Sequence, residues 1–281
     1  MTTGKQQIAW TDRLLPTTTA HHARLQIFQP TRTPIYCTRP LTKPGAKGEV
    51  IGTVEGKLGV MHALFLEVVC FYAERTKVIE GGSLQILVDP YQIRKTMGKA
   101  NGCYSGEGLD TLIKDIKKAV IHFTGEDSDL PDIDGILDRI EKSPRTRTHP
   151  ITGKERPLKR VVLTPTYRSW LERDLKLHYD PSPLADLRHG ISAALARLVL
   201  THRDQPVGGW KINGLIEAVG VRATSRARQL IKEDASGLAA LGILVDGGRV
   251  LKSPVHATPA GVHATPAPYT LRQRAYTPRQ G

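Results

Sequence analysis

The chain has 281 residues, which is enough to bury a core of its own and fits one large domain or two of ordinary size. It carries 40 Lys and Arg against 27 Asp and Glu, a formal net charge of +13. This excess favours a polyanionic partner, either nucleic acid or an anionic membrane surface. We expect no membrane span, because His62 and Glu67 interrupt the longest apolar run, and a span needs roughly 18 apolar residues.

The N-terminus and the cysteines favour a cytoplasmic protein. The chain does not begin with a basic region followed by an apolar core, so we expect no signal peptide. Its three cysteines, Cys37, Cys70 and Cys103, are odd in number and far apart. They suit a reducing compartment better than a disulfide scaffold.

Composition predicts a mobile tail at each end. Residues 1–22 are polar and show little periodicity. Residues 254–281 repeat Val-His-Ala-Thr-Pro-Ala and contain no acidic residue, a composition too rich in proline to fold. We interpret this segment as a solvated tail without a function of its own. The alternative is a loose nucleic-acid tether built on Arg272, Arg274 and Arg279.

Between the tails, one order of elements occurs twice. In the first copy, apolar spacing predicts a helix over 61–72, and "SLQILVD" predicts a strand. A short helix over 90–97 follows, then glycines, then a long helix from Ser105 to Phe123. Two β-like stretches, "DGILDRIEKS" and "LKRVVLTP", close the copy and are joined by a basic insert at about 144–157.

The second copy is shorter. It has a helix over 191–199, the strand "WKI", a short helix over 212–219, and Thr224 as the N-cap of a helix that runs towards Leu241. The hairpin "ILVDGGRVLKS" follows, with a glycine-rich turn. Asp234 falls on the apolar side of the last helix, which indicates a kink or an early end near Gly237.

Helix, strand, helix, turn, helix and hairpin is the winged helix-turn-helix order. We therefore predict an α+β fold of two tandem winged helix-turn-helix domains with mobile N- and C-terminal tails. The predicted boundaries are 1–22, 23–178, 179–253 and 254–281.

The polar face of the last helix in each copy is the candidate DNA-binding surface. On the 105–123 helix, Thr111, Lys114 and Lys118 lie opposite the apolar side, with Lys117 at its margin. In an isolated helix this is an ordinary solvated face. The last helix of a helix-turn-helix, however, is the one that enters the major groove.

Residue chemistry suggests roles on these faces. Lys and Arg suit phosphate oxygens, whereas Arg, Gln and Asn can pair with base edges. Arg226 and Gln229 are the better candidates for reading bases, and the lysines for holding phosphates. The full candidate set is Lys99, Asn101, Tyr104, Ser105, Thr111, Lys114, Lys117, Lys118, Arg222, Thr224, Ser225, Arg226, Arg228, Gln229, Lys232 and Arg249.

Several stretches resemble a known family. "NGCYSGEGLDTLIKDI", "VIHF", "ILDRIEKS", "LKRVVLTPTYRSWL" and "LKLHYD" resemble the first winged helix of plasmid replication initiators of the TrfA type. "HGISAALARLVLTHRD", "LIEAVGV" and "LAALGILV" are similar to the second winged helix of that family and of the IncQ RepC initiators. The resemblance covers roughly 23–252. The family's sliding-clamp peptide is not matched by "LQIFQP" at 25–30, which we expect to be the first β-like segment of the domain.

The resemblance implies a bacterial protein that binds double-stranded DNA at directly repeated sites, or iterons, in a plasmid origin. It implies that the protein helps to open neighbouring AT-rich DNA and brings in the replicative helicase, with other replisome proteins as further partners. A homodimer formed through the first domain would be the inactive form. Such initiators often repress their own gene.

Enzymatic functions find little support in the sequence. No P-loop, C-x-x-C or H-E-x-x-H motif is present, so we expect no catalytic residue, metal or cofactor. His21-His22 does not have the spacing of a relaxase metal site. A winged-helix transcriptional repressor that binds an operator as a homodimer is the alternative, and a rolling-circle nickase is a third hypothesis. Duplication within one chain favours the initiator, since a repressor usually obtains its second unit by dimerising.

Overall fold

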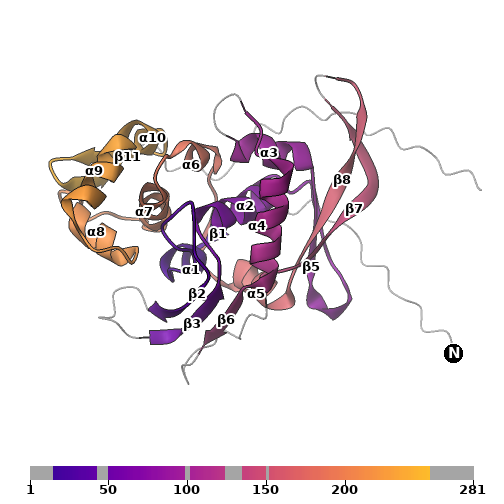
Figure 1. Ribbon diagram of the computed structural model, residues 1–281, viewed down its shortest axis with the longest axis horizontal. Coiled ribbons are helices and arrows are strands. Elements are labelled where there is room, and N and C mark those ends of the chain that lie inside the picture. Colours follow the sequence, from indigo (N-terminus) through magenta and orange to yellow (C-terminus); the bar gives the residue numbers. More distant parts are fainter. Residues whose placement is uncertain (1–14, 43–49, 99–101, 124–134, 150–151, 254–281) are drawn as a thin grey trace, which may run out of the picture.

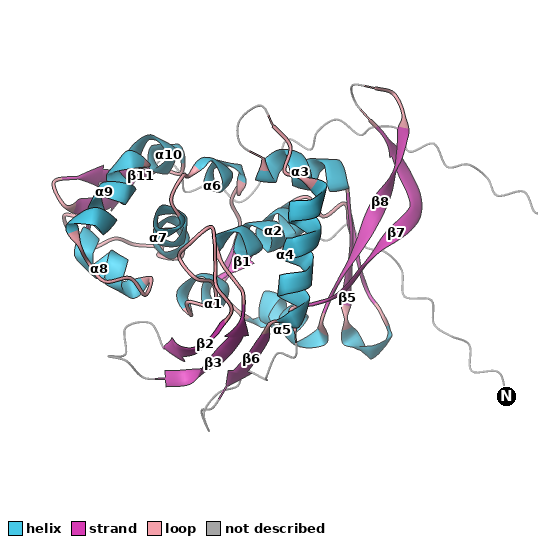
Figure 2. Cartoon of the chain, in the orientation of Figure 1, coloured by secondary structure: helices cyan, strands magenta, loops and turns pink. Residues whose placement is uncertain are grey.

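The structure, a computed structural model, describes residues 15–42, 50–98, 102–123, 135–149 and 152–253 (Figure 1). Helices and strands are mixed along this part of the chain (Figure 2), as the sequence predicted. The predicted C-terminal tail and residues 1–14 of the predicted N-terminal tail lie outside the described residues.

Residues 15–22 are packed, which corrects the prediction that they belong to a mobile tail. The short strand β1 (Thr18–Thr19) pairs antiparallel with β9 (Lys176–Leu177), and α1 (Ala20–Arg24) follows it. The prediction failed because threonines look polar in sequence, whereas their hydroxyls have partners inside the protein. Thr17 Oγ1 donates to the carbonyl of Tyr179 at 2.8 Å, and Thr18 Oγ1 lies 2.6 Å from His22 Nδ1.

The N-terminal segment also contacts the second copy. Arg24 Nε donates to Thr201 Oγ1 at 2.8 Å, and Gln26 Nε2 donates to the carbonyl of Ala218 at 2.9 Å. These contacts join residues on both sides of the predicted domain boundary between 178 and 179, so that boundary stays a prediction. The β-like segment expected at 25–30 is wrong, because it contains no strand and its one ladder contact is an isolated bridge between Gln29 and Gly59.

Three helices of the first copy lie close to their predicted positions. They are α2 (Val60–Phe71), α3 (Pro90–Met97) and α4 (Gly106–Lys118). Local chemistry fixes their starts: Asp89 Oδ1 accepts from the Tyr91 amide at 2.9 Å, and Ser105 Oγ accepts from the Gly108 amide at 3.0 Å. Such caps satisfy amides that have no partner within the helix.

The long helix ends earlier than predicted. It stops at Lys118, and β6 (Val120–Phe123) then pairs with β3 (Val50–Gly56), whose other neighbour is β2 (Cys37–Thr42). Val120 and Phe123 fit the helical spacing of the apolar residues, so this spacing did not reveal the change from helix to strand after Lys118. β-branched and aromatic residues such as those of "VIHF" also favour strands.

A four-stranded antiparallel sheet completes the first copy. Its strands, in spatial order, are β4 (Arg75–Val78), β5 (Leu84–Val88), β8 (Glu155–Leu163) and β7 (Leu137–Thr148). The insert predicted at about 144–157 is mostly strand, because β7 continues to Thr148 and β8 begins at Glu155, with Arg147 paired to Arg156. In Figure 1 this hairpin extends beyond the helices.

The second copy follows its prediction more closely. Its elements are α7 (Gly190–Leu200), β10 (Trp210–Lys211), α8 (Ile212–Ala218), α9 (Ser225–Glu233), α10 (Ala235–Ala240), β11 (Ile243–Asp246) and β12 (Arg249–Lys252). The expected break in the last helix occurs at Asp234, three residues before Gly237. The buried carboxylate of Asp234 accepts hydrogen bonds from the backbone amides of Arg188 and His189, each at 2.9 Å. The helix therefore ends at Asp234, whose side chain binds the loop before α7.

The two copies share a strand order. We call α2, β5, α3, α4, β7 and β8 the first unit, and α7, β10, α8, α9, β11 and β12 the second unit. The first unit has the sheet order β5-β8-β7 and the second has β10-β12-β11. In each, the strand before the short helix pairs with the second strand of the hairpin. The helices α4 and α9 therefore hold equivalent places in the two units.

Other elements lie outside the two units, among them a 3₁₀ turn and two connecting helices. The 3₁₀ turn η1 (Glu80–Gly82) connects β4 to β5, and α5 (Pro165–Arg173) and α6 (Ser182–Asp186) connect the first unit to the second. Apolar side chains of both units, of α5 and of α6 form one continuous buried cluster. The units are therefore held together by a shared core.

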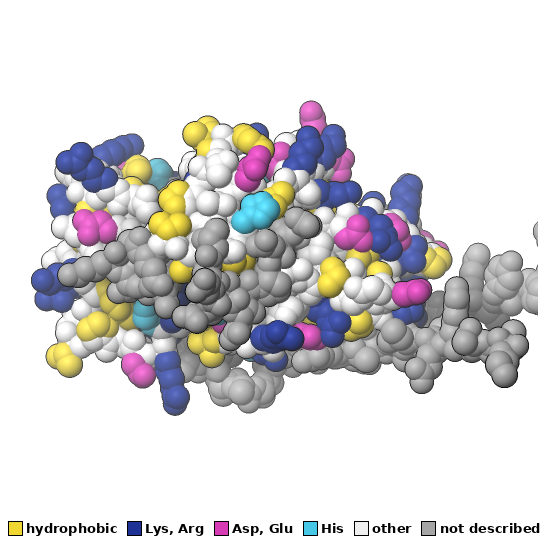
Figure 3. Space-filling model, turned by 90° about the horizontal axis from the view of Figure 1, so that it is seen from below, with side chains coloured by type: hydrophobic (Ala, Val, Ile, Leu, Met, Phe, Trp, Pro, Cys, Tyr) yellow, Lys and Arg dark blue, Asp and Glu magenta, His cyan; other side chains and the backbone are white. Residues whose placement is uncertain are grey.

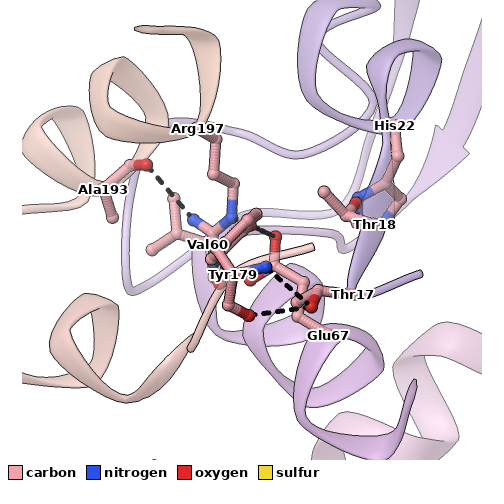
Figure 4. Close-up of polar contacts among 8 residues, drawn as sticks. All are labelled: Thr17, Thr18, His22, Val60, Glu67, Tyr179, Ala193 and Arg197. Atoms are coloured by element: carbon pink, nitrogen blue, oxygen red, sulfur yellow. Dashed lines mark hydrogen bonds and ion pairs between the residues drawn. The ribbon is translucent and has the colours of Figure 1, made fainter. Parts of the chain in front are cut away.

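A buried ion pair also joins the units (Figure 4). Arg197 of α7 donates through Nε and Nη2 to the two carboxylate oxygens of Glu67 in α2, at 2.7 and 2.8 Å. Tyr179 adds its hydroxyl to Glu67 Oε1 at 2.9 Å. Both charged side chains are almost inaccessible, at 0% for Glu67 and 5% for Arg197. Bidentate geometry and the added hydrogen bond offset the cost of burying these charges.

The 30–34 loop, residues Pro30 to Pro34, touches the first helix of each unit. A Cβ on Gly59, the N-cap of α2, would lie 2.6 Å from the carbonyl oxygen of Thr31. A Cβ on Gly190, the first residue of α7, would lie 2.4 Å from Thr31 Cα. Both positions require glycine because the same loop passes over both helix starts.

Candidate nucleic-acid interface

The helix α4 presents a polar face to solvent. Its inner side is held by buried Leu112 and Ile116, and by Asp115, which lies 3.5 Å from His62 Nε2 of α2. Burial lowers the pKa of His62, and Asp115 opposes this shift. The predicted site residues Ser105, Thr111, Lys114, Lys117 and Lys118 are all exposed.

Charge on α4 is graded along its length. Glu107 lies in the first turn, and Lys117 and Lys118 lie in the last turn. This arrangement also complements the helix dipole, so these two lysines have a structural explanation beside a functional one. Lys114 lies between these ends, is exposed and has no carboxylate partner among the described residues, which makes it the clearest phosphate candidate on α4.

The turn before α4 is partly described. Lys99 and Asn101 lie outside the described residues. Tyr104 is half-buried, and its backbone carbonyl accepts from Arg94 Nε at 2.8 Å. Burial raises the pKa of Tyr104, while the charge of Arg32 opposes the shift, so the start of α4 lies within electrostatic reach of the 30–34 loop.

The outer face of α9 carries the candidate base-reading residues. Arg226 is 72% exposed, and its Nη1 lies 3.8 Å from Glu233 Oε1. Gln229 Nε2 donates weakly to the same oxygen at 3.4 Å. Exposed pairs of this kind contribute little to stability, so both side chains can exchange Glu233 for another partner. Arg222, Ser225 and Lys232 are also exposed.

Three predicted residues of the second unit have structural partners. Thr224 caps α9, its Oγ1 accepting from the Ala227 amide at 3.1 Å. Arg228 Nη1 donates to Asn213 Oδ1 of α8 at 3.1 Å, and Arg249 Nη1 donates to the carbonyl of Gly209 at 3.2 Å. The two arginines keep further donors for a phosphate, but they also hold α9 and the hairpin in place.

Some arginines of the basic hairpin β7–β8 form ion pairs within the protein. Arg147 Nη1 lies 2.6 Å from Glu74 Oε1, and Arg156 binds the buried carboxylate of Asp89 through Nε, at 2.9 Å, and Nη2. These pairs attach the hairpin to the body of the first unit. Lys142 and Lys154 are exposed and have no carboxylate partner in the described part of the chain.

A cleft that the sequence did not predict lies beside α9. Its volume is about 440 Å³, and it is bounded by the 30–33 segment, the start of α7 and the first half of α9. Arg32, Arg188 and Arg226 line it, and no carboxylate does. Arg32 and Arg188 were missed because they lie about 40 to 200 residues from α9 in sequence, so no local pattern connects the three segments.

On the face drawn in Figure 3, the basic side chains do not form one continuous patch. In the view of Figure 3, Lys and Arg are spread over the surface with Asp and Glu between them. The candidate interface is therefore defined by α4, α9 and the cleft rather than by overall charge. In the ranges given above, no group of three or more His, Cys, Asp or Glu is placed to hold a metal ion. Nor does this part of the chain contain a helix with the length and apolar character of a membrane span.

Comparisons with known proteins give a structural similarity but no match in sequence. No family model and no curated protein matches the chain. Among solved structures, the chain resembles the crystal structure of domains 2 and 3 of RctB, with a TM-score of 0.48 and 13% sequence identity. The match covers 83% of this chain and 95% of that one. A similarity at this level carries no functional argument, so the function is argued from the geometry of this chain.

Proposed function

We propose that the chain is a replication initiator that binds double-stranded DNA through two winged helix-turn-helix units. The observation that carries the proposal is the repeated topology, in which α4 and α9 occupy equivalent places, each after a short helix and before a hairpin. In a helix-turn-helix, this second helix lies in the major groove and its exposed side chains contact the bases. Both helices expose polar, largely basic faces.

The exposed faces of α4 and α9 differ in residue type and therefore have different roles in this proposal. On α4 the exposed cations are lysines, which suit phosphate oxygens and fix the register of the protein on the duplex. On α9, Arg226 and Gln229 carry forked donors or amides that can pair with a base edge through two hydrogen bonds. Sequence choice therefore belongs mainly to the second unit.

The form of the DNA site follows from having two unlike units in one chain. A homodimeric repressor has identical units and matches a palindromic operator. Here the two faces differ in composition, and the shared core and the Glu67–Arg197 pair hold the units together. One chain then matches one asymmetric sequence, and several chains match direct repeats. This supports iteron binding over repression by a homodimer.

The later steps belong to the same proposal. The protein acts by binding and distorting DNA rather than by a chemical step. It helps to open adjacent AT-rich DNA, brings in the replicative helicase, and represses its own gene when a site lies in the promoter. A homodimer would be its inactive form.

Footprinting of the purified full chain on the plasmid origin tests the proposal. We expect protection of direct repeats of about one to two helical turns, roughly 20 base pairs, beside an AT-rich tract. Protection of an inverted repeat in the promoter alone would favour the repressor. Protection away from any repeat would contradict both functions.

A further inference from the structure

The cleft beside α9 has the charge of an anion site. Arg188 is exposed, and its side chain has no carboxylate partner among the described residues. Among the described residues, the one contact of the Arg226 side chain with a carboxylate is the 3.8 Å approach to Glu233. Asp234 and Asp186 lie close enough to raise the pKa of Arg32 against the effect of burial, but the Asp234 carboxylate is already bound to the backbone amides of Arg188 and His189. Of the three arginines that line the cleft, Arg32 and Arg188 therefore have no ion pair with a carboxylate among the described residues.

Arg32 supplies a third, partly buried cation. Its Nη1 donates to the carbonyls of Leu187 at 2.5 Å and Ala185 at 3.4 Å, which fixes the guanidinium against the loop before α7. Within the described residues, its Nε and Nη2 have no acceptor. Burial lowers the pKa of Arg32, with Tyr104 and Asp234 opposing the shift, so this charge has lost part of its hydration. An anion in the cleft would compensate that loss.

The shape of the cleft fits more than a bare ion. Its floor is apolar, since Ile191 and Ala227 are 5% exposed and Leu230 is partly buried, whereas its rim carries the exposed arginines. A deoxyribose phosphate unit has this distribution, with an apolar sugar and a charged phosphate. The volume of about 440 Å³ is of the size that holds one such unit.

The position of the cleft relates it to both units. It opens along the first half of α9, and Arg32, which lines it, lies close enough to Tyr104, the residue before the N-cap of α4, for its charge to oppose the rise in the pKa of Tyr104. We propose that this cleft binds a sugar-phosphate unit of the DNA backbone, with Arg188 and Arg32 holding the phosphate between the two DNA-binding units. The inference rests on the proposed DNA-binding function and adds to it a contact that neither recognition helix supplies.

The test is binding of the full chain to duplex origin DNA by fluorescence anisotropy over a series of salt concentrations. We expect Arg188→Gln to weaken binding to every DNA sequence, by about fivefold to tenfold at 0.1 M salt, and to reduce the salt slope by about 1. Arg188→Lys keeps the charge and should restore most of the affinity. Arg173→Gln, at an exposed position on α5, is the matched control and should leave the affinity unchanged.

Two further arms separate the inference from its alternatives. Lys114→Gln tests the proposed function independently: if it weakens binding while Arg188→Gln does not, the cleft proposal fails and DNA binding stands. If no duplex is bound, both fail. Titration with inorganic phosphate at constant ionic strength distinguishes the source of the anion. Stabilisation by free phosphate that Arg188→Gln abolishes, without any change in DNA affinity, would overturn the assignment to the DNA backbone.

Discussion

Glu67 and Arg197 form the buried contact between equivalent helices of the two units. Each is the eighth residue of its helix, counted from Val60 in α2 and from Gly190 in α7. Their bidentate pairing sets how these helices lie against each other, and α4 and α9 are built on the same two units. We therefore expect a change in this ion pair to alter how the exposed faces of α4 and α9 are placed relative to each other.

Removing one partner of this pair should destabilise the protein strongly. Arg197→Met leaves the Glu67 carboxylate buried without a cation, which typically costs about 3–5 kcal/mol. The double variant Glu67→Leu with Arg197→Met removes both charges and should recover much of that loss. Urea unfolding of the unmodified chain, the single variants Glu67→Leu and Arg197→Met, and the double variant measures the coupling. A loss below about 1 kcal/mol in Arg197→Met would show that the pair does not hold the units together.

The buried histidine of α1 predicts a specific loss of stability in acid. Burial lowers the pKa of His22 to about 3, with Arg197 adding to the shift and Asp174 opposing it. The unfolded side chain has its ordinary pKa of about 6.5. As pH falls from 6.5 towards 3, the unfolded chain therefore takes up a proton that the folded chain does not, and stability present above pH 6.5 is lost. The folding equilibrium constant falls by up to about tenfold per pH unit from this group.

His22→Asn should remove that contribution. Unfolding midpoints in urea between pH 4 and 7 would then depend less steeply on pH than in the unmodified chain. Equal slopes for the unmodified chain and His22→Asn would mean that His22 takes up its proton at the same pH in the folded and the unfolded chain, which would contradict a lowered pKa.

We expect Asp234 to stabilise the fold through its two carboxylate oxygens, which accept hydrogen bonds. Asp234→Ala leaves the amides of Arg188 and His189 without their side-chain acceptor, and we expect a loss of about 2–4 kcal/mol in unfolding free energy. Asp234→Asn keeps one acceptor oxygen and should lose about half as much. If Asp234→Ala and Asp234→Asn both lower the unfolding free energy only slightly, water replaces the carboxylate as the acceptor for the two amides, and the contact does not stabilise the protein.

Two glycines give opposite predictions for alanine. Gly190→Ala places a Cβ 2.4 Å from Thr31 Cα, so it should destabilise the chain and displace the 30–34 loop from the cleft. Gly214→Ala lies within α8 with no heavy atom within 4 Å of the new Cβ, and should stabilise by about 0.5–1 kcal/mol. Thermal unfolding distinguishes them. Stability gained in both would place the loop away from α7.

Local sequence signals predicted the ends of several elements but not all of them. Ser105 and Thr224 were expected at helix starts, and each makes the capping hydrogen bond that its chemistry allows. Asp234 was noticed as an exception to the apolar pattern, and it ends α9. The end of α4 was missed, because Val120 and Phe123 satisfy both a helical and a strand pattern.

Long-range features were beyond local patterns. The packing of residues 15–22 depends on β9, more than 150 residues away. The 30–34 loop meets Gly59 and Gly190 only in three dimensions, and the cleft with Arg32 and Arg188 follows from that meeting. Charge and spacing indicated the faces of α4 and α9, and which of their side chains contact DNA stays a prediction.

The central claim is that α4 and α9 contact one DNA site together. A hydroxyl-radical footprint of the full chain on origin DNA tests it most directly. We predict two protected segments within each repeat. The double variant Lys114→Gln with Lys118→Gln should weaken one segment, and Arg226→Ala with Gln229→Ala should weaken the other. A single protected segment, or one that neither pair of substitutions changes, would contradict the claim.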